Sequence, residues 1–322
     1  MEIFLYIAAL LAGFAALAWS ADKFIVGASN IARSLNVSPL IIGITVVGFG
    51  TSAPEILVSA MAAMQNTPGI AVGNAIGSNI TNIALVIGFT AVIIPIAVRP
   101  QIIKREMPML FIIMAICLLF FYDLKLTFIE GIIFLVLQIA VLAWAVHVSR
   151  KEKDHSAEEL ADDQETMSLS KAIFWLIVGL LLLLGSSKLL VWGAVGIAKL
   201  FGVPELVIGL TIVALGTSLP ELAASITSVR KGHPDIAIGN ILGSNIFNIL
   251  SVLGVASVIT EIDLEPVVLY RDYSIMAILT ILLLIFSYRF GKQRGTINRL
   301  EGVGFLCVYC GYQALLFLKV GF

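Results

Sequence analysis

The sequence predicts an all-α polytopic membrane protein with ten transmembrane helices, which form two inverted five-helix repeats and are broken near their centre. The first observation is composition: of the 322 residues, 59% are apolar and only 13% are charged, against roughly 45–50% and about 25% in a soluble domain. The second is that the charged residues cluster between apolar runs of about 17 to 25 residues, the length of a membrane-spanning helix. The third is that two blocks of sequence recur at one fixed spacing. The first two exclude a soluble enzyme, and the third divides the chain into halves.

The ten expected spans follow from dividing the apolar runs at charges, Pro and Gly. They lie at residues 3–33, 38–65, 70–97, 107–122, 127–148, 171–199, 204–229, 235–259, 269–288 and 299–319. Residues 149–170 are rich in charge and show no apolar periodicity, so they are predicted to be a linker. The linker separates a first repeat at 1–148 from a second repeat at 171–322.

The placement of Lys and Arg predicts the orientation, because basic residues accumulate in short loops on the cytoplasmic side. Fifteen of the 20 basic residues lie in segments that follow odd-numbered spans, and five lie on the opposite side. We therefore expect a multi-pass protein of the cell membrane with both termini extracellular and the central linker cytoplasmic.

The internal repeat has a constant offset of 166 residues. Residues 37–55 align without gaps on 203–221 with 11 identities in 19, and residues 70–88 align on 236–254 with 12 in 19. Since each half holds an odd number of spans, the second half enters the membrane from the opposite side. Inverted repeats of this kind are typical of transporters that bind substrate near the midplane.

The second and seventh spans carry the motifs GTSAPE at 50–55 and GTSLPE at 216–221. Proline cannot donate to the carbonyl four residues earlier, so Pro54 frees the carbonyl of Gly50 and Pro220 frees that of Gly216. The helices can break there, and unpaired carbonyls at this depth must be buried in protein or face a polar cavity. A bound cation would satisfy them.

Glu55 and Glu221 lie near the middle of these spans, where an ionised side chain is costly and usually functional. Hydroxyl groups share the same helical face at spacings of three and four residues, namely those of Thr51, Ser52, Thr217 and Ser218. If the repeats meet head to head, they form an all-oxygen shell suited to Ca²⁺, without the imidazole or thiolate that favours zinc or copper. Without an ion, two like charges would lie in a low dielectric, so the site must take up cations or protons.

The third and eighth spans carry GNAIGSNITN at 73–82 and GNILGSNIFN at 239–248, whose glycine spacing permits close helix approach. Ser78 with Asn82, and Ser244 with Asn248, lie four residues apart and offer neutral oxygens to an ion. The remaining asparagines of these motifs could bond the broken backbone equally well and are not assigned as ligands: Asn74, Asn79, Asn240 and Asn245.

Other features point to no further function. A net charge of −1 lacks the excess of basic residues that is typical of proteins that bind nucleic acid. The three histidines lie near span ends or in loops, the three cysteines lie in apolar runs, and the acidic linker has no EF-hand spacing.

The paired GTSxPE and GNxxGSNxxN blocks resemble the alpha repeats of the sodium/calcium exchanger family, within the calcium/cation antiporter superfamily and especially its small prokaryotic members. The alpha-1 motifs correspond to 43–82 and the alpha-2 motifs to 209–248. The resemblance implies a ten-helix inverted-repeat fold with broken helices at the ion site, in which Na⁺ and Ca²⁺ compete for a four-site cluster. It also implies alternating access by sliding of spans 1 and 6, no cofactor, and function as a monomer in the lipid bilayer.

Carried over by motif position, the resemblance makes Glu55 and Glu221 the shared carboxylates, while the backbone carbonyls of Thr51 and Thr217 bind Ca²⁺. One Na⁺ site then comprises Ala214, Thr217, Ser218, Glu221 and Ser78, and its mirror comprises Gly48, Thr51, Ser52, Glu55 and Ser244. Asn82 and Asn248 line the middle. Some relatives carry Asp at the position of Asn248, so its absence speaks against K⁺ cotransport.

The sequence thus favours a secondary antiporter that exchanges Na⁺ for Ca²⁺, exporting Ca²⁺ as Na⁺ enters. Three alternatives stay open at this point. They are an H⁺/Ca²⁺ exchanger on the same fold, a cation channel, and an intramembrane hydrolase with Ser52 or Ser218 as nucleophile, although no membrane-embedded His or Lys lies near those serines to act as the base. The resemblance implies three Na⁺ per Ca²⁺.

Overall fold

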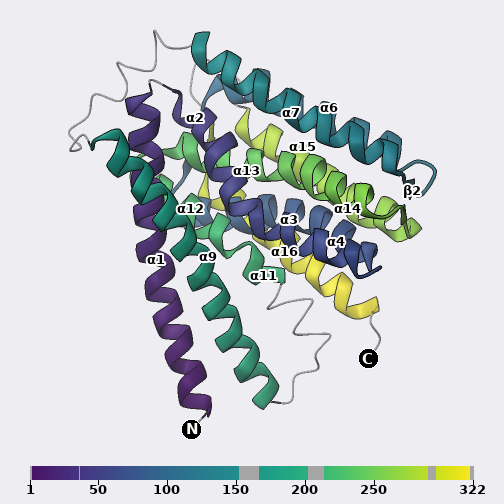
Figure 1. The fold of residues 1–322 in the computed structure, drawn as a ribbon, viewed down its shortest axis with the longest axis horizontal. Helices are drawn as coiled ribbons and strands as arrows, with labels where there is room; N and C mark the ends of the chain where they lie inside the picture. The colour runs from purple at the N-terminus through teal and green to yellow at the C-terminus, as the bar shows by residue number, and fades with distance from the viewer. Residues whose placement is uncertain (1, 36, 152–166, 202–213, 289–294, 320–322) are drawn as a thin grey trace.

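The computed structural model describes residues 2–35, 37–151, 167–201, 214–288 and 295–319 (Figure 1). The fold is all-helical apart from four very short strands. Seven helical stretches within the described part are long and apolar enough to cross a membrane, and each overlaps one of the ten expected spans. Most of the predicted linker, at 152–166, and residues 202–213 of the second repeat lie outside the described residues.

The two longest helices, α1 (Glu2–Ser34) and α9 (Leu169–Leu200), pack antiparallel along one flank of the bundle (Figure 1). They are the first spans of the two repeats. Glycine allows their backbones to touch: a Cβ atom added at Gly27 would lie 2.5 Å from the amide nitrogen of Leu176, and one at Gly179 would lie 2.6 Å from that of Phe24. Small residues at such crossings let helices approach closely in a membrane.

The rest of the first repeat is a run of helices with π-helical insertions. Its second span comprises α2 (Pro39–Ile42), the π-helix η1 (Gly43–Val47) and α3 (Gly48–Met64), and its third comprises α4 (Pro68–Thr81), η2 (Asn82–Ile87) and α5 (Gly88–Ile93). The π-helix η3 (Ile102–Glu106) then leads into α6 (Met107–Phe120), and α7 (Phe128–Lys151) ends the repeat.

The second repeat follows the same order with its own interruptions. Its elements are α11 (Ala214–Thr217), α12 (Leu219–Arg230), α13 (Pro234–Phe247), η5 (Asn248–Val252), α14 (Leu253–Ile259), η6 (Val268–Tyr273), α15 (Ser274–Ser287) and α16 (Arg299–Lys319). The π-helices that begin at Asn82 and Asn248 are related by the repeat offset. π-Helical turns of this kind are frequent at functional sites.

The predicted helix breaks differ between the repeats. In the second, α11 ends at Thr217 and α12 begins at Leu219, so the helix breaks at Ser218, within the GTSLPE motif. In the first, α3 continues through Pro54. The expectation of a break there is wrong, and the irregular backbone lies instead in η1, immediately before Gly48.

Two short antiparallel ladders join the repeats at opposite ends of α6. Strand β1 (Ile96–Val98), just before α6, pairs with β4 (Gly295–Ile297), and β2 (Lys125–Leu126), just after it, pairs with β3 (Ile262–Asp263). The ladders satisfy backbone groups of the connecting segments that would otherwise lack partners.

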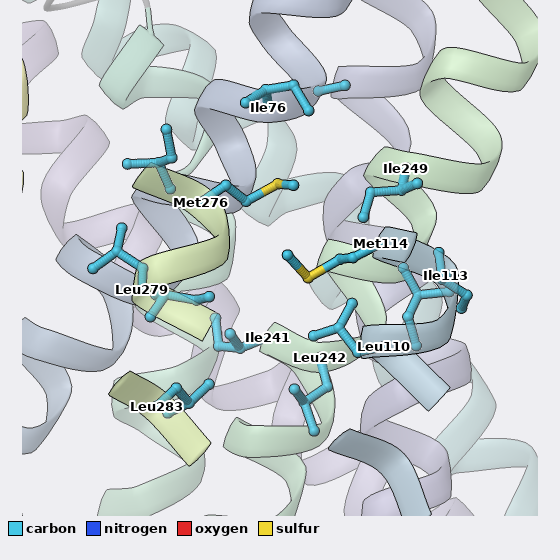
Figure 2. Packing of buried hydrophobic residues seen from close by; sticks show 14 of the residues in the cluster. Ile76, Leu110, Ile113, Met114, Ile241, Leu242, Ile249, Met276, Leu279 and Leu283 are labelled. Atoms are coloured by element: carbon cyan, nitrogen blue, oxygen red, sulfur yellow. The ribbon is translucent and has the colours of Figure 1, made fainter. Parts of the chain in front are cut away.

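The core is built from both repeats together. Figure 2 shows Ile113 and Met114 of α6 facing Ile249 of the second repeat, with Met276 and Leu279 of α15 on the other side of the cluster. Helix α13 is buried along its whole length. A helix enclosed on all sides inside a membrane protein contacts protein rather than lipid, so its polar side chains must find partners within the bundle.

Candidate ion-binding site

Glu55 on α3 and Glu221 on α12 are both 1% exposed and therefore lie in the interior of the protein. Each carboxylate lies near a threonine of the other repeat: Glu55 lies near Thr217, and Glu221 lies near Thr51. The two carboxylates are also close enough to repel each other. The head-to-head meeting of the GTSxPE motifs is therefore a property of the fold.

The half of the site around Thr51 is closely packed against α13. The Thr51 hydroxyl donates to Asn240 Oδ1 at 3.0 Å and lies 3.4 Å from Ser244 Oγ, which itself donates to the carbonyl oxygen of Gly48 at 3.5 Å. A Cβ atom at Gly48 would lie 3.1 Å from the amide nitrogen of Ser244. Three members of the predicted mirror site, Gly48, Thr51 and Ser244, are thus brought together.

The half around Thr217 is more open. Ser78 and Thr217 both line a cavity of about 460 Å³ that extends along α4. Ala214 begins α11, one turn before Ser218. The structure therefore places Ser78 of the first repeat and Thr217 of the second on the lining of one cavity.

Six buried oxygens in the centre have no hydrogen-bond partner within the described residues. They form three pairs at the repeat offset: Ser52 Oγ and Ser218 Oγ, Glu55 Oε2 and Glu221 Oε2, and Asn82 Oδ1 and Asn248 Oδ1. An unsatisfied buried polar atom is costly, and here all six can accept from a donor or bind a cation. Oxygen atoms alone are the ligand set that Ca²⁺ and Na⁺ prefer over softer metals.

The amide groups of the asparagine motifs explain why only oxygens are left unpartnered. Asn82 Nδ2 donates to Asn245 Oδ1 at 3.1 Å, and Asn248 Nδ2 donates to Asn79 Oδ1 at 3.2 Å. Each bond crosses between the repeats. The donors are therefore used between α4 and α13, and the free oxygens of Asn82 and Asn248 remain for the site.

Asn74 and Asn240 hold the helices that carry the glutamates. Asn74 Nδ2 donates to the Glu55 carbonyl at 3.1 Å and to Ser59 Oγ at 2.9 Å. Asn240 repeats both contacts, to the Glu221 carbonyl at 3.4 Å and to Ser225 Oγ at 3.1 Å. The two asparagines bond backbone, as the sequence suggested. Ser59 and Ser225 were missed, although both lie four residues after a glutamate at the repeat offset.

The carbonyl of Gly216 has a protein partner. Ser187 Oγ on α9 donates to it at 2.7 Å. This carbonyl therefore does not depend on a bound cation for a partner, because α9 supplies the hydrogen bond that Pro220 cannot. The bond also connects α9 directly to the motif beside the site.

The site depends on two carboxylates supported by neutral oxygens. Within the described residues, no group of three or more His, Cys, Asp or Glu side chains could hold a metal ion. Two buried carboxylates without countercharge are unfavourable. The arrangement therefore suits a bound cation, which would supply the missing countercharge.

Comparisons with known proteins agree with this geometry. The family described as "Sodium/calcium exchanger protein" matches residues 5–146 and 171–318. The chain is 50% identical over 312 residues to "Putative antiporter CaxA" of Alkalimonas amylolytica, covering 96% of this chain and 97% of that protein. It is 38% identical to the inner membrane protein YrbG of Escherichia coli K12, covering 93% and 92%, and 30% identical to the sodium/calcium exchanger MaX1 of Methanosarcina acetivorans, covering 96% and 97%.

Solved structures show the same likeness over the whole chain. The sodium-calcium exchanger NCX_Mj soaked with zero Na⁺ and Ca²⁺ superposes with a TM-score of 0.84 at 34% identity, covering 98% of this chain and 99% of that chain. The same exchanger soaked with 10 mM Na⁺ and 10 mM Sr²⁺ gives a TM-score of 0.83, with coverage of 97% and 98%. The chain belongs to the sodium/calcium exchanger family and is a multi-pass cation/calcium antiporter, not an enzyme.

Proposed function

We propose that this protein exchanges Na⁺ for Ca²⁺ by alternating access and exports Ca²⁺ as Na⁺ enters. The observation that carries the proposal is the set of six unpartnered oxygens, which includes one oxygen of each buried glutamate. Two carboxylates balance the charge of one Ca²⁺ or of two Na⁺, and an empty site would leave them unbalanced. The need for countercharge during crossing is the physical basis of obligatory exchange. The likeness to exchangers named for sodium and calcium supports the choice of ions.

The ligand sets are proposed from geometry and motif position together. Glu55 and Glu221 are shared, and Thr51 and Thr217 offer their backbone carbonyls to Ca²⁺. One Na⁺ site takes Ala214, Thr217, Ser218 and Glu221 with Ser78, and the other takes Gly48, Thr51, Ser52 and Glu55 with Ser244. The oxygens of Asn82 and Asn248 complete the centre. With three Na⁺ per Ca²⁺, the exchange moves net charge.

The two sides of the site differ in packing, which supports alternating access. Gly239 and Gly243 on α13 lie against the backbone of α2 and η1: a Cβ atom at Gly243 would lie 2.3 Å from the carbonyl oxygen of Ile44. Their repeat counterparts, Gly73 and Gly77, line the cavity on α4. We propose that α1 and α9 slide together to exchange the closed and open sides. With both termini extracellular and the linker cytoplasmic, the cavity opens to the outside.

The intramembrane hydrolase and the channel are no longer competing functions, since the family is one of antiporters. Exchange of H⁺ for Ca²⁺ remains the competing coupling. Purified protein in proteoliposomes distinguishes the two: Ca²⁺ uptake is measured under a Na⁺ gradient at equal pH, and then under a pH gradient at equal Na⁺. We expect uptake under the Na⁺ gradient only, with a rate that depends on membrane potential. Uptake driven by the pH gradient alone would overturn the proposed coupling.

A further inference from the structure

The cavity beside the site runs from the end of the bundle towards the proposed ligands. It is lined at one end by Gly69 and Ile70, in the first turn of α4, and at the other by Ser78 and Thr217. Ser78 lies nine residues after Gly69, which is roughly 13 Å along a helix at 1.5 Å per residue. An ion that enters at the start of α4 and reaches the site through this cavity passes its lining.

Two charged side chains lie on this lining, and no others do among its described residues: Arg271 and Asp272 of η6. They form a bidentate pair, in which Arg271 Nε donates to Asp272 Oδ1 at 2.7 Å and Arg271 Nη2 donates to Oδ2 at 3.0 Å. The hydroxyl of Tyr312 also donates to Asp272 Oδ1, at 3.1 Å. The side chains are 23% and 13% exposed. The pair is therefore fixed, largely shielded and electrically neutral.

The first repeat carries the same pair in the same kind of element. Arg105 and Glu106 end the π-helix η3, 166 residues before Arg271 and Asp272, and Arg105 Nε donates to Glu106 Oε1 at 2.6 Å. Glu106 is 0% exposed, and the Arg105 guanidinium lies 5.6 Å from the centre of the Trp144 ring. In the pair at 105–106 the carboxylate is fully buried and the arginine is 25% exposed, whereas both members of the pair at 271–272 line the cavity.

Neutrality of the pair matters because of the ions that pass it. A cavity with low-dielectric walls focuses the field of any charge on its lining. The energy of an ion in that field is proportional to the charge of the ion. An unbalanced charge on the lining would therefore change the affinity for Ca²⁺ by the square of the factor by which it changes the affinity for each Na⁺.

We propose that Arg271 and Asp272, fixed by Tyr312, cancel each other's charge along the route to Ser78 and Thr217, so that neither charge alone shifts the balance between Ca²⁺ and Na⁺. This inference rests on the proposed function, since it takes Ser78 and Thr217 as ion ligands. Arg271 and Asp272 act as residues that determine specificity through the field and are not ligands themselves.

The test is a set of charge variants whose Ca²⁺ and Na⁺ affinities are measured by calorimetric titration of the full-length protein in detergent. Asp272→Asn leaves a guanidinium, which stays charged, facing the cavity. It should weaken binding of each Na⁺ about threefold and binding of Ca²⁺ about tenfold, for a potential of this order. Arg271→Gln should tighten the binding of both ions, and the change in the logarithm of the affinity should be twice as large for Ca²⁺ as for Na⁺.

The double variant R271Q/D272N separates the field from damage to the fold. It removes both charges and should return both affinities to those of the unsubstituted protein. If the single substitutions instead damaged the fold, the double variant would bind both ions more weakly than either single variant. Lys125→Gln is the matched control, because it removes one positive charge from a pair with Asp263 whose side chains are 66% and 91% exposed to water. It should leave both affinities unchanged, since exposed charges are screened within about 8–10 Å.

The outcomes are distinct. Equal shifts for the two ions, no shift, or a double variant weaker than either single variant would overturn the inference while leaving the proposed function intact. An unsubstituted protein that binds neither ion would instead contradict the proposed function itself.

Discussion

At the scale of single residues, the polar atoms of the site divide into those that hold the protein and those left for an ion. The amide nitrogens of Asn74, Asn82, Asn240 and Asn248 all donate to protein oxygens. One oxygen of Glu55 and one of Glu221 find no such partner. The division follows the repeat offset, so the two glutamates share the same asparagine contact and the same unpartnered oxygen, and they should have the same importance.

Glu55→Gln and Glu221→Gln should each abolish Ca²⁺ transport, because either change removes a shared carboxylate and leaves one charge to balance a divalent ion. We expect a loss of at least about 100-fold in Ca²⁺ affinity, since hydrogen bonds and contacts to buried charged groups are worth several kcal/mol each. Counterflow of radioactive Ca²⁺ in proteoliposomes measures the effect. Glu261→Gln, at an exposed loop position, is the control and should retain full flux. Normal flux in both site variants would refute the site.

His233 predicts a pH dependence at the turn between α12 and α13. Burial together with the nearby charges of Arg33 and Lys231 lowers the pKa of His233 below its ordinary value. The folded state therefore binds this proton less readily than the unfolded state, so stability is lost as pH falls through about 6.5. Thermal unfolding of the unsubstituted protein and of His233→Gln should differ more at pH 5.5 than at pH 7.5, with the variant losing less stability on acidification. An equal loss in both would contradict the assignment.

At the scale of elements, repeat-related helices carry the same motif in different packing. Gly243 on α13 lies against the backbone of Ile44, whereas no described atom lies within 4 Å of a Cβ added at its counterpart Gly77 on α4. Replacing glycine by alanine at position 243 therefore tests the packing of the closed side, and the same replacement at position 77 tests the open side.

Gly243→Ala should destabilise the protein, because the new methyl group would meet a carbonyl oxygen that cannot move without shifting the η1 backbone; overpacking of this kind costs about 1–3 kcal/mol. Gly77→Ala should leave the thermal stability unchanged but slow transport, because the open side must close during each cycle. Melting curves and initial flux rates of the two variants test this. If the Gly77→Ala variant is normally stable and transports Ca²⁺ at the normal rate, the proposal that the α4 face closes during transport is wrong.

The sequence predicted most of the arrangement of the site because its two motifs recur at a constant offset of 166 residues. The resemblance of the motifs to the exchanger family grouped Thr51 with Ser244 and Thr217 with Ser78, and the structure places the Thr51 and Ser244 hydroxyl oxygens 3.4 Å apart. The contact from Ser187 to Gly216 could not be predicted, since Ala21 stands at the corresponding position of α1 and the repeat carries no trace of it. The continuous helix at Pro54 and the pairing of β1 with β4 depend on tertiary packing, which overrides local backbone preference.

At the scale of the whole molecule, the empty site stores unfavourable electrostatic energy that an ion releases. Binding to the folded state alone stabilises it by about 2.7 kcal/mol at a concentration 100 times the dissociation constant. Ca²⁺ should therefore raise the melting temperature of the detergent-solubilised protein in a concentration-dependent manner. The rise should vanish in the double variant E55Q/E221Q. A rise that persists in that variant would show that Ca²⁺ binds elsewhere.

The two short ladders at opposite ends of α6 divide the molecule into a frame and a working part. β1 with β4 and β2 with β3 join the repeats to one another at the two ends of α6, and we expect the body between them to stay fixed during transport. In the described residues α1 and α9 belong to neither ladder, and their glycine contacts lock them to each other. We therefore expect α1 and α9 to move together as one pair. The distance that they move would be limited by the hydrogen bond from Ser187 on α9 to the Gly216 carbonyl beside the site.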